Sequence, residues 1–223
     1  MYKNSYPGKF IVFEGLDGSG QSTQANLLKD FLIKKGYQVV LIKEPTLSSE
    51  AGRKIRKVLD KKIKISPGKL QQLFSQDRKE HLEKVIIPAL KKGKIVISDR
   101  YFFSSLAYGA AEGLSLNYLI KLNKKFLLPD LTFILKVRPE ICLQRIKKRG
   151  TEWTLFEEKE KLKKVWRVYQ NLPSQIFKRK LGEGLPKKFG NAYIINGEKS
   201  IKEVFREVRK IVYKHITNKH IAK

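Results

Sequence analysis

The stretch GLDGSGQST, from Gly15 to Thr23, has the residue types and spacing of a phosphate-binding loop. Its frame is G-x-x-x-x-G-K-[ST], in which glycines let backbone N–H groups approach a phosphate and the next helix adds its N-terminal dipole. Ser22 stands where the frame places a hydroxyl ligand of Mg²⁺. Gln21 occupies the lysine position, so the loop lacks the charge that would lie against the transferred phosphate.

The missing lysine leaves two readings of this loop open. Removal of one preorganised, charge-stabilising donor lowers turnover by about 10²–10³-fold, so an enzyme would need a cation from elsewhere in the chain. The basic residues that we expect near the loop are Lys43, Arg100, Lys147, Lys148 and Arg149. The alternative is a nucleotide-binding protein that has lost the reaction.

Two further segments carry residues suited to chemistry. Asp99 and Arg100 directly follow the apolar run KIVIS, and they offer a carboxylate for Mg²⁺ or its water and a planar fork for a phosphate. In LFSQDRKEH, Phe74 and Arg78 are four residues apart and share one face of an expected helix. A ring for stacking beside a guanidinium suits a nucleobase, although a phenylalanine at such a position is more often a core residue.

Strands and helices alternate along the chain and must position these segments. Short apolar runs predict strands at 9–14, 37–43, 94–99, 131–137 and 191–196. Helical spacing predicts helices at 22–35, 50–60, 70–90, 139–149, 155–180 and 200–214, with two more on either side of Gly113. Pro88 and Pro173 are expected to bend or break their helices.

This alternation predicts an α/β fold with a five-stranded parallel sheet covered by helices on both faces. Ligands of such sheets bind beyond the carboxyl ends of the strands. The segments GLDGSGQST, EPT and DRY follow the first three predicted strands, so we expect them to meet at one edge of the sheet.

The bulk composition restricts the class of protein. The chain has 223 residues and 41% hydrophobic content, which favours one domain over residues 1–223. Its one cysteine allows no internal disulfide, and its three histidines are scattered, which argues against a zinc site. The sequence has neither an apolar run of about 18 residues nor a signal-peptide core, so no membrane association is expected and the location is expected to be cytoplasmic.

The net charge of +27 raises the possibility of a nucleic-acid partner. The lysines are spread along the whole chain rather than gathered in one block with aromatic residues, which argues against nucleic acid as the principal ligand. A basic surface would also attract small phosphorylated ligands. Steep salt dependence without nucleotide selectivity would identify a polyanion-binding protein instead.

Taken together, these motifs resemble the thymidylate kinase family of P-loop enzymes, which phosphorylate dTMP with ATP. The resemblance covers about residues 8–213 and rests on FEGLDGSGxST, the EP turn, LFxxDR, ISDRYxxSSLAY, LPDLTFxLxV and IINGEKSIKEVF. It implies the three-layer fold of P-loop NTPases, ATP and Mg²⁺ as cofactors, dTMP as small-molecule substrate and a homodimer.

The resemblance also implies a role for each matching residue. ATP would be bound by Gly15, Leu16, Asp17, Gly18, Ser19, Gly20, Gln21, Ser22, Thr23 and Arg149. dTMP would be bound by Asp17, Glu44, Phe74, Arg78, Arg100, Ser104, Ser105 and Tyr108. Ser22 and Asp99 would hold Mg²⁺, and the phosphoryl transfer itself would depend on Asp99, Arg100, Arg149 and Gln21.

Within the implied dTMP site, each group of residues would contact a different part of the nucleotide. Phe74 would stack on thymine and Arg78 would bond to its edge, with Ser104 and Ser105 lining the base pocket. Asp17 would lie near the sugar 3′-hydroxyl and Arg100 on the acceptor phosphate, while Tyr108 would press near C2′ and disfavour ribose.

The segment from about 147 to 157 matches the family's mobile lid over ATP. Gly18 and Ser19 leave the variable positions of the loop without a basic residue, which in the family goes with an arginine supplied by the lid. Arg149 is the expected lid arginine, with two lysines before it.

The chain departs from the family pattern at several positions. Gln21 replaces the loop lysine, and Lys43 replaces the arginine of the R-E-P motif, whose acid is kept as Glu44. Thr154 replaces a lid carboxylate, whereas Glu157 keeps its place. Two alternatives therefore stay open: a kinase of another deoxynucleotide or deoxynucleoside, and a catalytically weakened nucleotide-binding protein. Deoxynucleoside kinases tend to carry E-R-S where this chain has D-R-Y.

Overall fold

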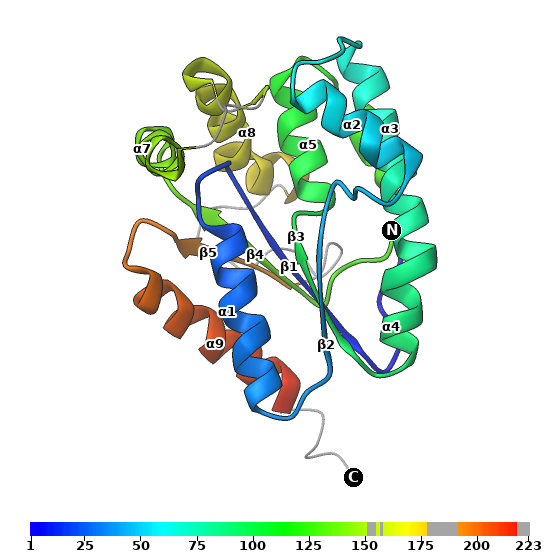
Figure 1. Cartoon of the computed structure of the whole chain (residues 1–223), viewed down its shortest axis with the longest axis vertical. Coiled ribbons are helices and arrows are strands. Elements are labelled where there is room, and N and C mark those ends of the chain that lie inside the picture. Colours follow the sequence, from blue (N-terminus) through cyan, green and yellow to red (C-terminus); the bar gives the residue numbers. More distant parts are fainter. Residues whose placement is uncertain (151–154, 157, 178–190, 218–223) are drawn as a thin grey trace.

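The computed structural model describes residues 1–150, 155–156, 158–177 and 191–217. Its centre is a sheet of five parallel strands between two layers of helices (Figure 1). The strands are β1 (Lys9–Gly15), β2 (Val39–Lys43), β3 (Ile95–Asp99), β4 (Leu131–Lys136) and β5 (Asn191–Asn196). Their order in the sheet is β2-β3-β1-β4-β5, so the strand that leads into the phosphate loop lies in the middle. The predicted five-stranded α/β fold is confirmed.

Helices fill the crossovers between the strands. They are α1 (Gln21–Lys34), α2 (Glu50–Leu59), α3 (Pro67–His81), η1 (Leu82–Ile86), α4 (Ile87–Lys91), α5 (Phe102–Ala111), α6 (Leu116–Asn123), α7 (Pro139–Arg149), α8 (Lys159–Phe177) and α9 (Ile201–Thr217). α1 and α9 cover one face of the sheet, and α4 and α5 lie against the other (Figure 1). None of the described helices is long and apolar enough to cross a membrane.

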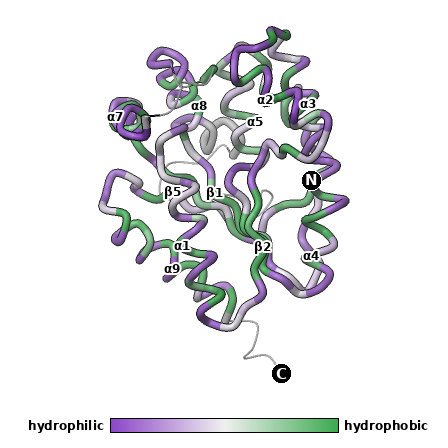
Figure 2. The backbone as a smooth tube through the Cα atoms, viewed as in Figure 1, coloured by the Kyte–Doolittle hydropathy of each residue, from purple (hydrophilic) through white to green (hydrophobic). Residues whose placement is uncertain are grey.

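The central strand shows why both faces of the sheet are covered. Phe10 and Val12 point into the core beneath α4 and α5, whereas Ile11 and Phe13 point into the core beneath α1 and α9. All four side chains are fully buried. A strand buried on both sides reads as a continuous apolar run, which is what KFIVFE is. Figure 2 shows the hydrophobic colour gathered along the strands and the hydrophilic colour on the outer helices.

Pro88 and Pro173 both lie within helices. The helix expected at 70–90 begins earlier, at Pro67, and a π-helical turn at Leu82–Ile86 precedes Pro88 in α4. A proline ring in a helix clashes with the carbonyl four residues before it, and a wider turn makes room for that ring. The expectation that Pro173 breaks its helix is wrong, because α8 continues to Phe177.

The carboxyl ends of β1, β2 and β3 bring the three predicted segments together. Lys43 is in register with Asp99, and the Glu44 N–H donates to the Asp99 carbonyl oxygen at 3.1 Å. The Arg100 N–H donates to the carbonyl oxygen of Phe13 at 2.8 Å. The convergence expected at this edge of the sheet is therefore confirmed.

Candidate active site

The phosphate loop joins β1 to α1 and requires glycine at its tightest points. Gly18 and Gly20 have φ values of +80° and +99°, in the left-handed region that side chains disfavour. A Cβ on Gly18 would lie 2.6 Å from the carbonyl oxygen of Cys142 on α7. The loop is thus pressed against α7, and α1 begins immediately after Gly20 with its N-terminal N–H groups at the loop.

Gln21 is turned into the loop. Its side chain is buried, its Nε2 donates to the Gly15 carbonyl oxygen at 2.9 Å, and its Oε1 accepts from the Ser19 hydroxyl at 2.9 Å. Through these two bonds the Gln21 side chain links Gly15, at the start of the loop, to Ser19, near its end. The carboxamide therefore binds groups of the loop itself and adds no charge to it.

A hydroxyl and a carboxylate lie next to the loop. Ser22 Oγ donates a hydrogen bond to Asp99 Oδ2, and Lys43 Nζ lies 3.3 Å from the same oxygen. Mg²⁺ at nucleotide sites is held by few protein oxygens and is completed by phosphates and water. Ser22 and Asp99 supply a hydroxyl oxygen and a carboxylate oxygen side by side, which fits such a site.

Arg100 follows β3 at the carboxyl-terminal edge of the sheet, and its partners hold its side chain in a fixed orientation. Its φ is +76°, an unusual value for a residue with a side chain, and such values concentrate at functional sites. Its guanidinium donates to the Gly15 carbonyl oxygen at 3.0 Å and to Asp17 Oδ1 at 2.7 Å. It also lies 5.2 Å from the ring centre of Tyr108, whose hydroxyl donates to Asp17 Oδ2 at 2.7 Å.

The ionisation of this cluster follows from burial and charge. Burial opposes the charge on Arg100, but the Asp17 carboxylate, together with Tyr108, Tyr169 and Asp99, outweighs that effect and raises the pKa of the guanidinium. Burial raises the pKa of the Tyr108 phenol well above its ordinary value, and the Asp17 carboxylate adds to this against the opposing charge of Arg100. At neutral pH the cluster therefore presents a permanent cation beside a neutral phenol.

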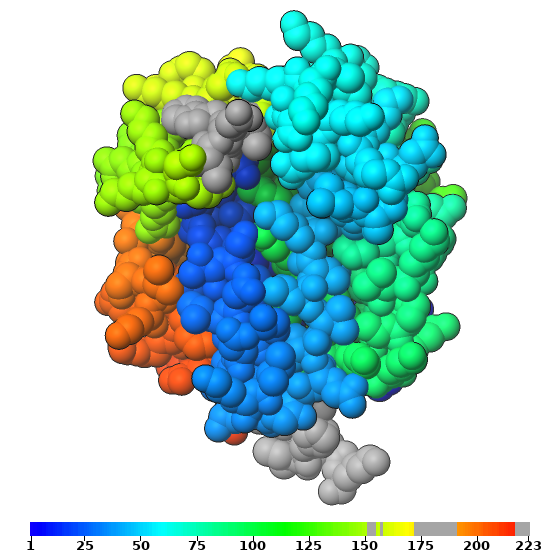
Figure 3. Space-filling view, in the orientation of Figure 1, coloured from blue at the N-terminus to red at the C-terminus, as the bar shows by residue number. Residues whose placement is uncertain are grey.

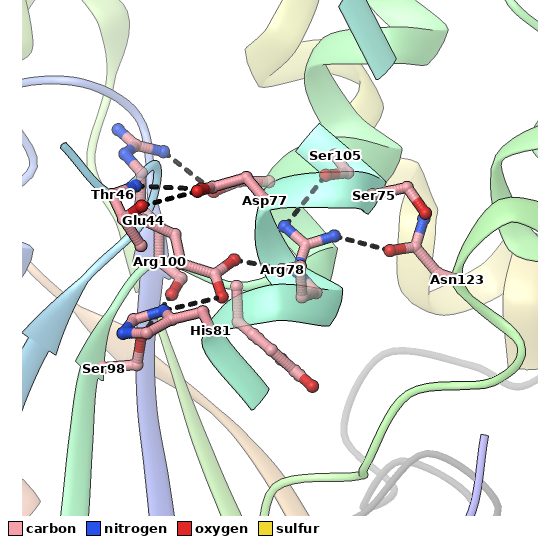
Figure 4. A network of polar contacts seen from close by, with 12 residues as sticks. Glu44, Thr46, Ser75, Asp77, Arg78, His81, Ser98, Arg100, Ser105 and Asn123 are labelled. Atoms are coloured by element: carbon pink, nitrogen blue, oxygen red, sulfur yellow. Dashed lines mark hydrogen bonds and ion pairs between the residues drawn. The ribbon is translucent and has the colours of Figure 1, made fainter. Parts of the chain in front are cut away.

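Arg78 forms a second, deeper cluster (Figure 4). Its Nε donates to Glu44 Oε2 at 2.8 Å, its Nη1 to Asn123 Oδ1 at 2.6 Å and its Nη2 to Ser105 Oγ at 3.1 Å. His81 Nδ1 lies 3.4 Å from the other oxygen of Glu44. A guanidinium has five N–H groups, so two remain for a ligand after these three bonds. Arg78 is almost completely buried, and its partners fix its plane.

A cavity of about 680 Å³ connects the two clusters. It is lined by Asp17, Lys43, Glu44, Pro45, Arg56, Leu59, Asp60, Gln71, Phe74, Arg78, Arg100, Tyr101, Ser104, Ser105, Tyr108, Arg149 and Phe156. Figure 3 shows the surface hollowed between the segments coloured blue, from β1 to α1, and cyan, from α2 to α3. Cavities of this size take a nucleotide-sized ligand.

The cavity is lined by nine of the predicted site residues: Asp17, Glu44, Phe74, Arg78, Arg100, Ser104, Ser105, Tyr108 and Arg149. Asp17 is the only residue of the phosphate loop among them, and Asp99 does not line the cavity. The side chain of Leu16 is buried in the core. Thr23 is exposed on the first turn of α1. Arg149 ends α7 and lines the cavity.

The predicted lid lies only partly within the described chain. Residues 151–154 and 157, which include Thr154 and Glu157, lie outside the described residues. Between them, the Leu155 N–H donates to the Leu59 carbonyl oxygen at 2.9 Å, and the Phe156 ring lies 5.0 Å from the ring of Tyr108. This part of the segment covers the cavity from α2 to α5.

Two buried acids at the site are missing from the sequence-based prediction. Glu14 accepts from Ser104 Oγ at 2.5 Å, and Ser104 in turn accepts from Arg100 Nη1 at 2.9 Å, so Glu14 orients Arg100 through a hydroxyl. Burial raises the pKa of Glu14, and the bond from Ser104 partly offsets this. Asp77 binds the backbone N–H and hydroxyl of Thr46 at 2.8 and 2.6 Å, which holds the chain after β2.

The sequence contains an indication of each of these acids, Glu14 and Asp77. Glu14 is a charged residue at the end of an otherwise apolar predicted strand, and a buried charge is unusual unless it is paired. Asp77 directly precedes Arg78 in LFSQDR. Their hydrogen-bond partners are distant in sequence. The sequence therefore singles out these two residues but does not show what they bind.

The fold and the site define a class. A parallel sheet with a glycine-rich phosphate loop after its central strand, a hydroxyl–carboxylate pair beside that loop and an arginine-lined cavity are the parts of a P-loop nucleotide-binding protein built for phosphoryl transfer.

Comparison with known proteins identifies the family within this class. Residues 13–208 match the family model described as thymidylate kinase. The chain is 42% identical over 210 residues to a probable thymidylate kinase of Pyrococcus horikoshii, an alignment that covers 92% of this chain and 96% of that protein. It is 39% identical over 211 residues to a thymidylate kinase of Caldicellulosiruptor saccharolyticus, again covering 92% of this chain and 96% of the relative. The chain belongs to the thymidylate kinase family.

Proposed function

We propose that the protein transfers the γ-phosphoryl group of ATP to dTMP, giving dTDP, with Mg²⁺. The observation that carries the proposal is the single cavity that joins Phe74 and Arg78 on α3 to Arg100 beside the phosphate loop. A nucleoside monophosphate needs a stacking surface at one end and a cation at the other. Family membership supports dTMP as the monophosphate.

We assign the acceptor nucleotide to the cavity. Phe74 stacks on the base, and the two remaining N–H groups of Arg78, with Ser105 beside them, face its edge. Arg100 binds the acceptor phosphate through its planar fork, held in place by Asp17 and Ser104. Glu44 acts through Arg78.

The sugar lies between these ends in our assignment. Asp17 then faces the 3′-hydroxyl, and Tyr108, buried against Arg100, limits the space near C2′. Ribonucleotides would have to place their extra hydroxyl against this ring, so we expect selection for deoxyribose.

The donor nucleotide belongs at the loop from Gly15 to Thr23 and at the start of α1. ATP phosphates bind the backbone N–H groups of this loop. Ser22 and Asp99 hold Mg²⁺, which when bound neutralises phosphate charge as the phosphoryl group moves. The protein's own contribution is to position donor and acceptor in line and to stabilise the transition state electrostatically.

The charge that Gln21 lacks comes, in our proposal, from Arg149 at the end of α7, with Lys43 and Arg100 on the acceptor side. All three cations line the cavity. Lys43 is already paired with Asp99, at the place where Mg²⁺ would bind, so it would shift toward phosphate when the ion arrives. Arg149 follows the part of α7 on which the phosphate loop rests.

We also infer, from the family alone, a homodimer located in the cytoplasm, with no nucleic-acid or membrane partner. Product analysis tests the main proposal. Purified protein with ATP, Mg²⁺ and dTMP should form dTDP and ADP in equal amounts, and thymidine in place of dTMP should give no phosphorylated product. Phosphorylation of thymidine in preference to dTMP would identify a nucleoside kinase instead.

A further inference from the structure

Gln71 is a buried polar residue of the cavity to which the assignments above give no role. Gln71 lies on α3, three residues before Phe74 and seven before Arg78, so all three share one face of the helix. All three line the cavity. The Cα atoms of Gln71 and Arg78 are about 10 Å apart along the helix axis, and both long side chains extend from the helix to the cavity on which Phe74 also lies.

Gln71 is buried with an unsatisfied amide. Its side chain is 4% exposed, and its Oε1 has no hydrogen-bond partner among the described residues. Two other buried polar atoms share this property, Gln24 Oε1 and Thr132 Oγ1, but neither residue lines the cavity. A buried amide without a partner is costly, so its presence at a ligand cavity points to a partner on the ligand.

The helix opposite leaves space for this amide. A Cβ on Gly109 of α5 would lie 3.3 Å from Gln71 Cδ and 2.6 Å from Leu119 Cδ2. Any larger residue at position 109 would push against Leu119 and the Gln71 amide. Gly109 therefore keeps the carboxamide between α3 and α5, at the base end of the cavity.

The chemistry of a carboxamide matches one edge of a pyrimidine-2,4-dione. That base has an imide N–H next to two carbonyl oxygens. A carboxamide has an acceptor beside a donor, so it can accept the imide N–H and donate to the adjacent carbonyl. Arg78 offers only donors and therefore suits a carbonyl oxygen, not the imide N–H. Phe74, between the two on α3, supplies the stacking surface.

We propose that Gln71 is a specificity-determining residue that accepts the imide N–H of the pyrimidine base while Arg78 binds a carbonyl oxygen. The proposal rests on the function proposed above, because it places the base of the acceptor nucleotide on Phe74. Gln71 reads the base but takes no part in the transfer. Its loss should change the affinity for the acceptor and leave the affinity for ATP unaltered.

The test combines a variant with a modified nucleotide. Gln71→Met keeps the volume of the side chain and removes both hydrogen-bonding groups. dTMP with a methyl group on the imide nitrogen lacks the N–H that Gln71 would accept. We measure KM and kcat for ATP and for both acceptors, with Gln76→Met as the matched control, since Gln76 is exposed on the same helix.

The parent protein should prefer dTMP over the methylated nucleotide by about tenfold or more, the effect of leaving a buried acceptor unpaired. In Gln71→Met, KM for dTMP should rise by a similar factor and the preference should fall close to one, with kcat and KM for ATP unchanged. Gln76→Met should match the parent. A preference unchanged in Gln71→Met would overturn the role of Gln71 while leaving the kinase intact.

Two further readouts keep the outcome interpretable. If the parent protein fails to use dTMP at all, the proposed function is wrong and the inference falls with it. If Gln71→Met melts well below the parent, Gln71→Ala and the methylated nucleotide on the parent protein give the same comparison. A parent protein that accepts the methylated nucleotide as well as dTMP would contradict the proposed contact without any variant.

Discussion

The Nε2 atom of Gln21 donates a hydrogen bond to the carbonyl oxygen of Gly15 at 2.9 Å, across the phosphate loop. A lysine in this frame points at the phosphates, whereas this glutamine points at the loop's own backbone. Glutamine in place of lysine therefore removes a cation and adds hydrogen bonds within the loop. We therefore predict that side chains at the edge of the cavity supply the catalytic charge.

Arg149 is the first place to look for that charge. Arg149→Ala should lower kcat by about 10²–10³-fold, as for the loss of one preorganised donor, with KM for dTMP changed little. Lys148→Ala is the matched control, because Lys148 is exposed on the same turn and does not line the cavity. A kcat that survives Arg149→Ala but falls in Lys43→Met would assign the charge to the end of β2.

The proposed Mg²⁺ site at Ser22 and Asp99 leads to a test with a conservative variant. Asp99→Asn keeps the shape and removes the anionic ligand, so the Mg²⁺ concentration for half-maximal activity should rise about tenfold or more. Saturating Mg²⁺ should restore part of the rate. The same dose–response curve for Asp99→Asn and parent would show that the ion binds elsewhere.

The sequence predicted the fold well because the information is local. Each strand is a short apolar run and each helix has its own spacing. The helices expected at 22–35 and 139–149 end at Lys34 and Arg149, just before the positive-φ glycines Gly36 and Gly150. The π-turn before Pro88 was not predictable in the same way, since it depends on how a proline is accommodated in a packed helix.

The site was predicted as a set of residues but not as a network. Arg78 was expected to face a base, yet three of its five N–H groups are bound to Glu44, Asn123 and Ser105, which come from other elements. The orientation of the Gln21 side chain could not be predicted either. Its partners are the Gly15 carbonyl and the Ser19 hydroxyl, and nothing in the sequence marks these groups as partners. Side-chain direction, unlike spacing, is set by the tertiary structure.

The buried pair of Arg78 and Glu44 predicts a stability effect that is separate from catalysis. Arg78→Met leaves the Glu44 carboxylate buried without its main partner and should lower the free energy of unfolding by about 3–5 kcal/mol. Glu44→Gln should also destabilise, and the double variant should lose less than the sum of the two. Denaturant unfolding of the four proteins gives the coupling directly. Strictly additive losses would mean that the two side chains act independently.

Cys142 predicts a pH effect in the alkaline range. Burial raises the pKa of its thiol from 9.0 to about 12, so the folded protein keeps the proton at pH values where the unfolded chain has lost it. The unfolded state then binds fewer protons, and stability should fall as pH rises from about 9 toward 12. Denaturant unfolding at pH 8, 9 and 10 should show a shallower decline for Cys142→Ala than for the parent. Parallel declines would place the titration in other groups.

The central claim is that this kinase works without the loop lysine. The most direct test is steady-state ADP release by the parent and by Gln21→Lys with ATP, Mg²⁺ and dTMP, beside dUMP, dCMP, UMP and thymidine. The account predicts turnover by the parent that is selective for dTMP, and a gain of less than about tenfold in Gln21→Lys, because other cations already supply the charge. A silent parent that gains dTMP turnover in Gln21→Lys would contradict the account and identify a nucleotide-binding protein that has lost its reaction.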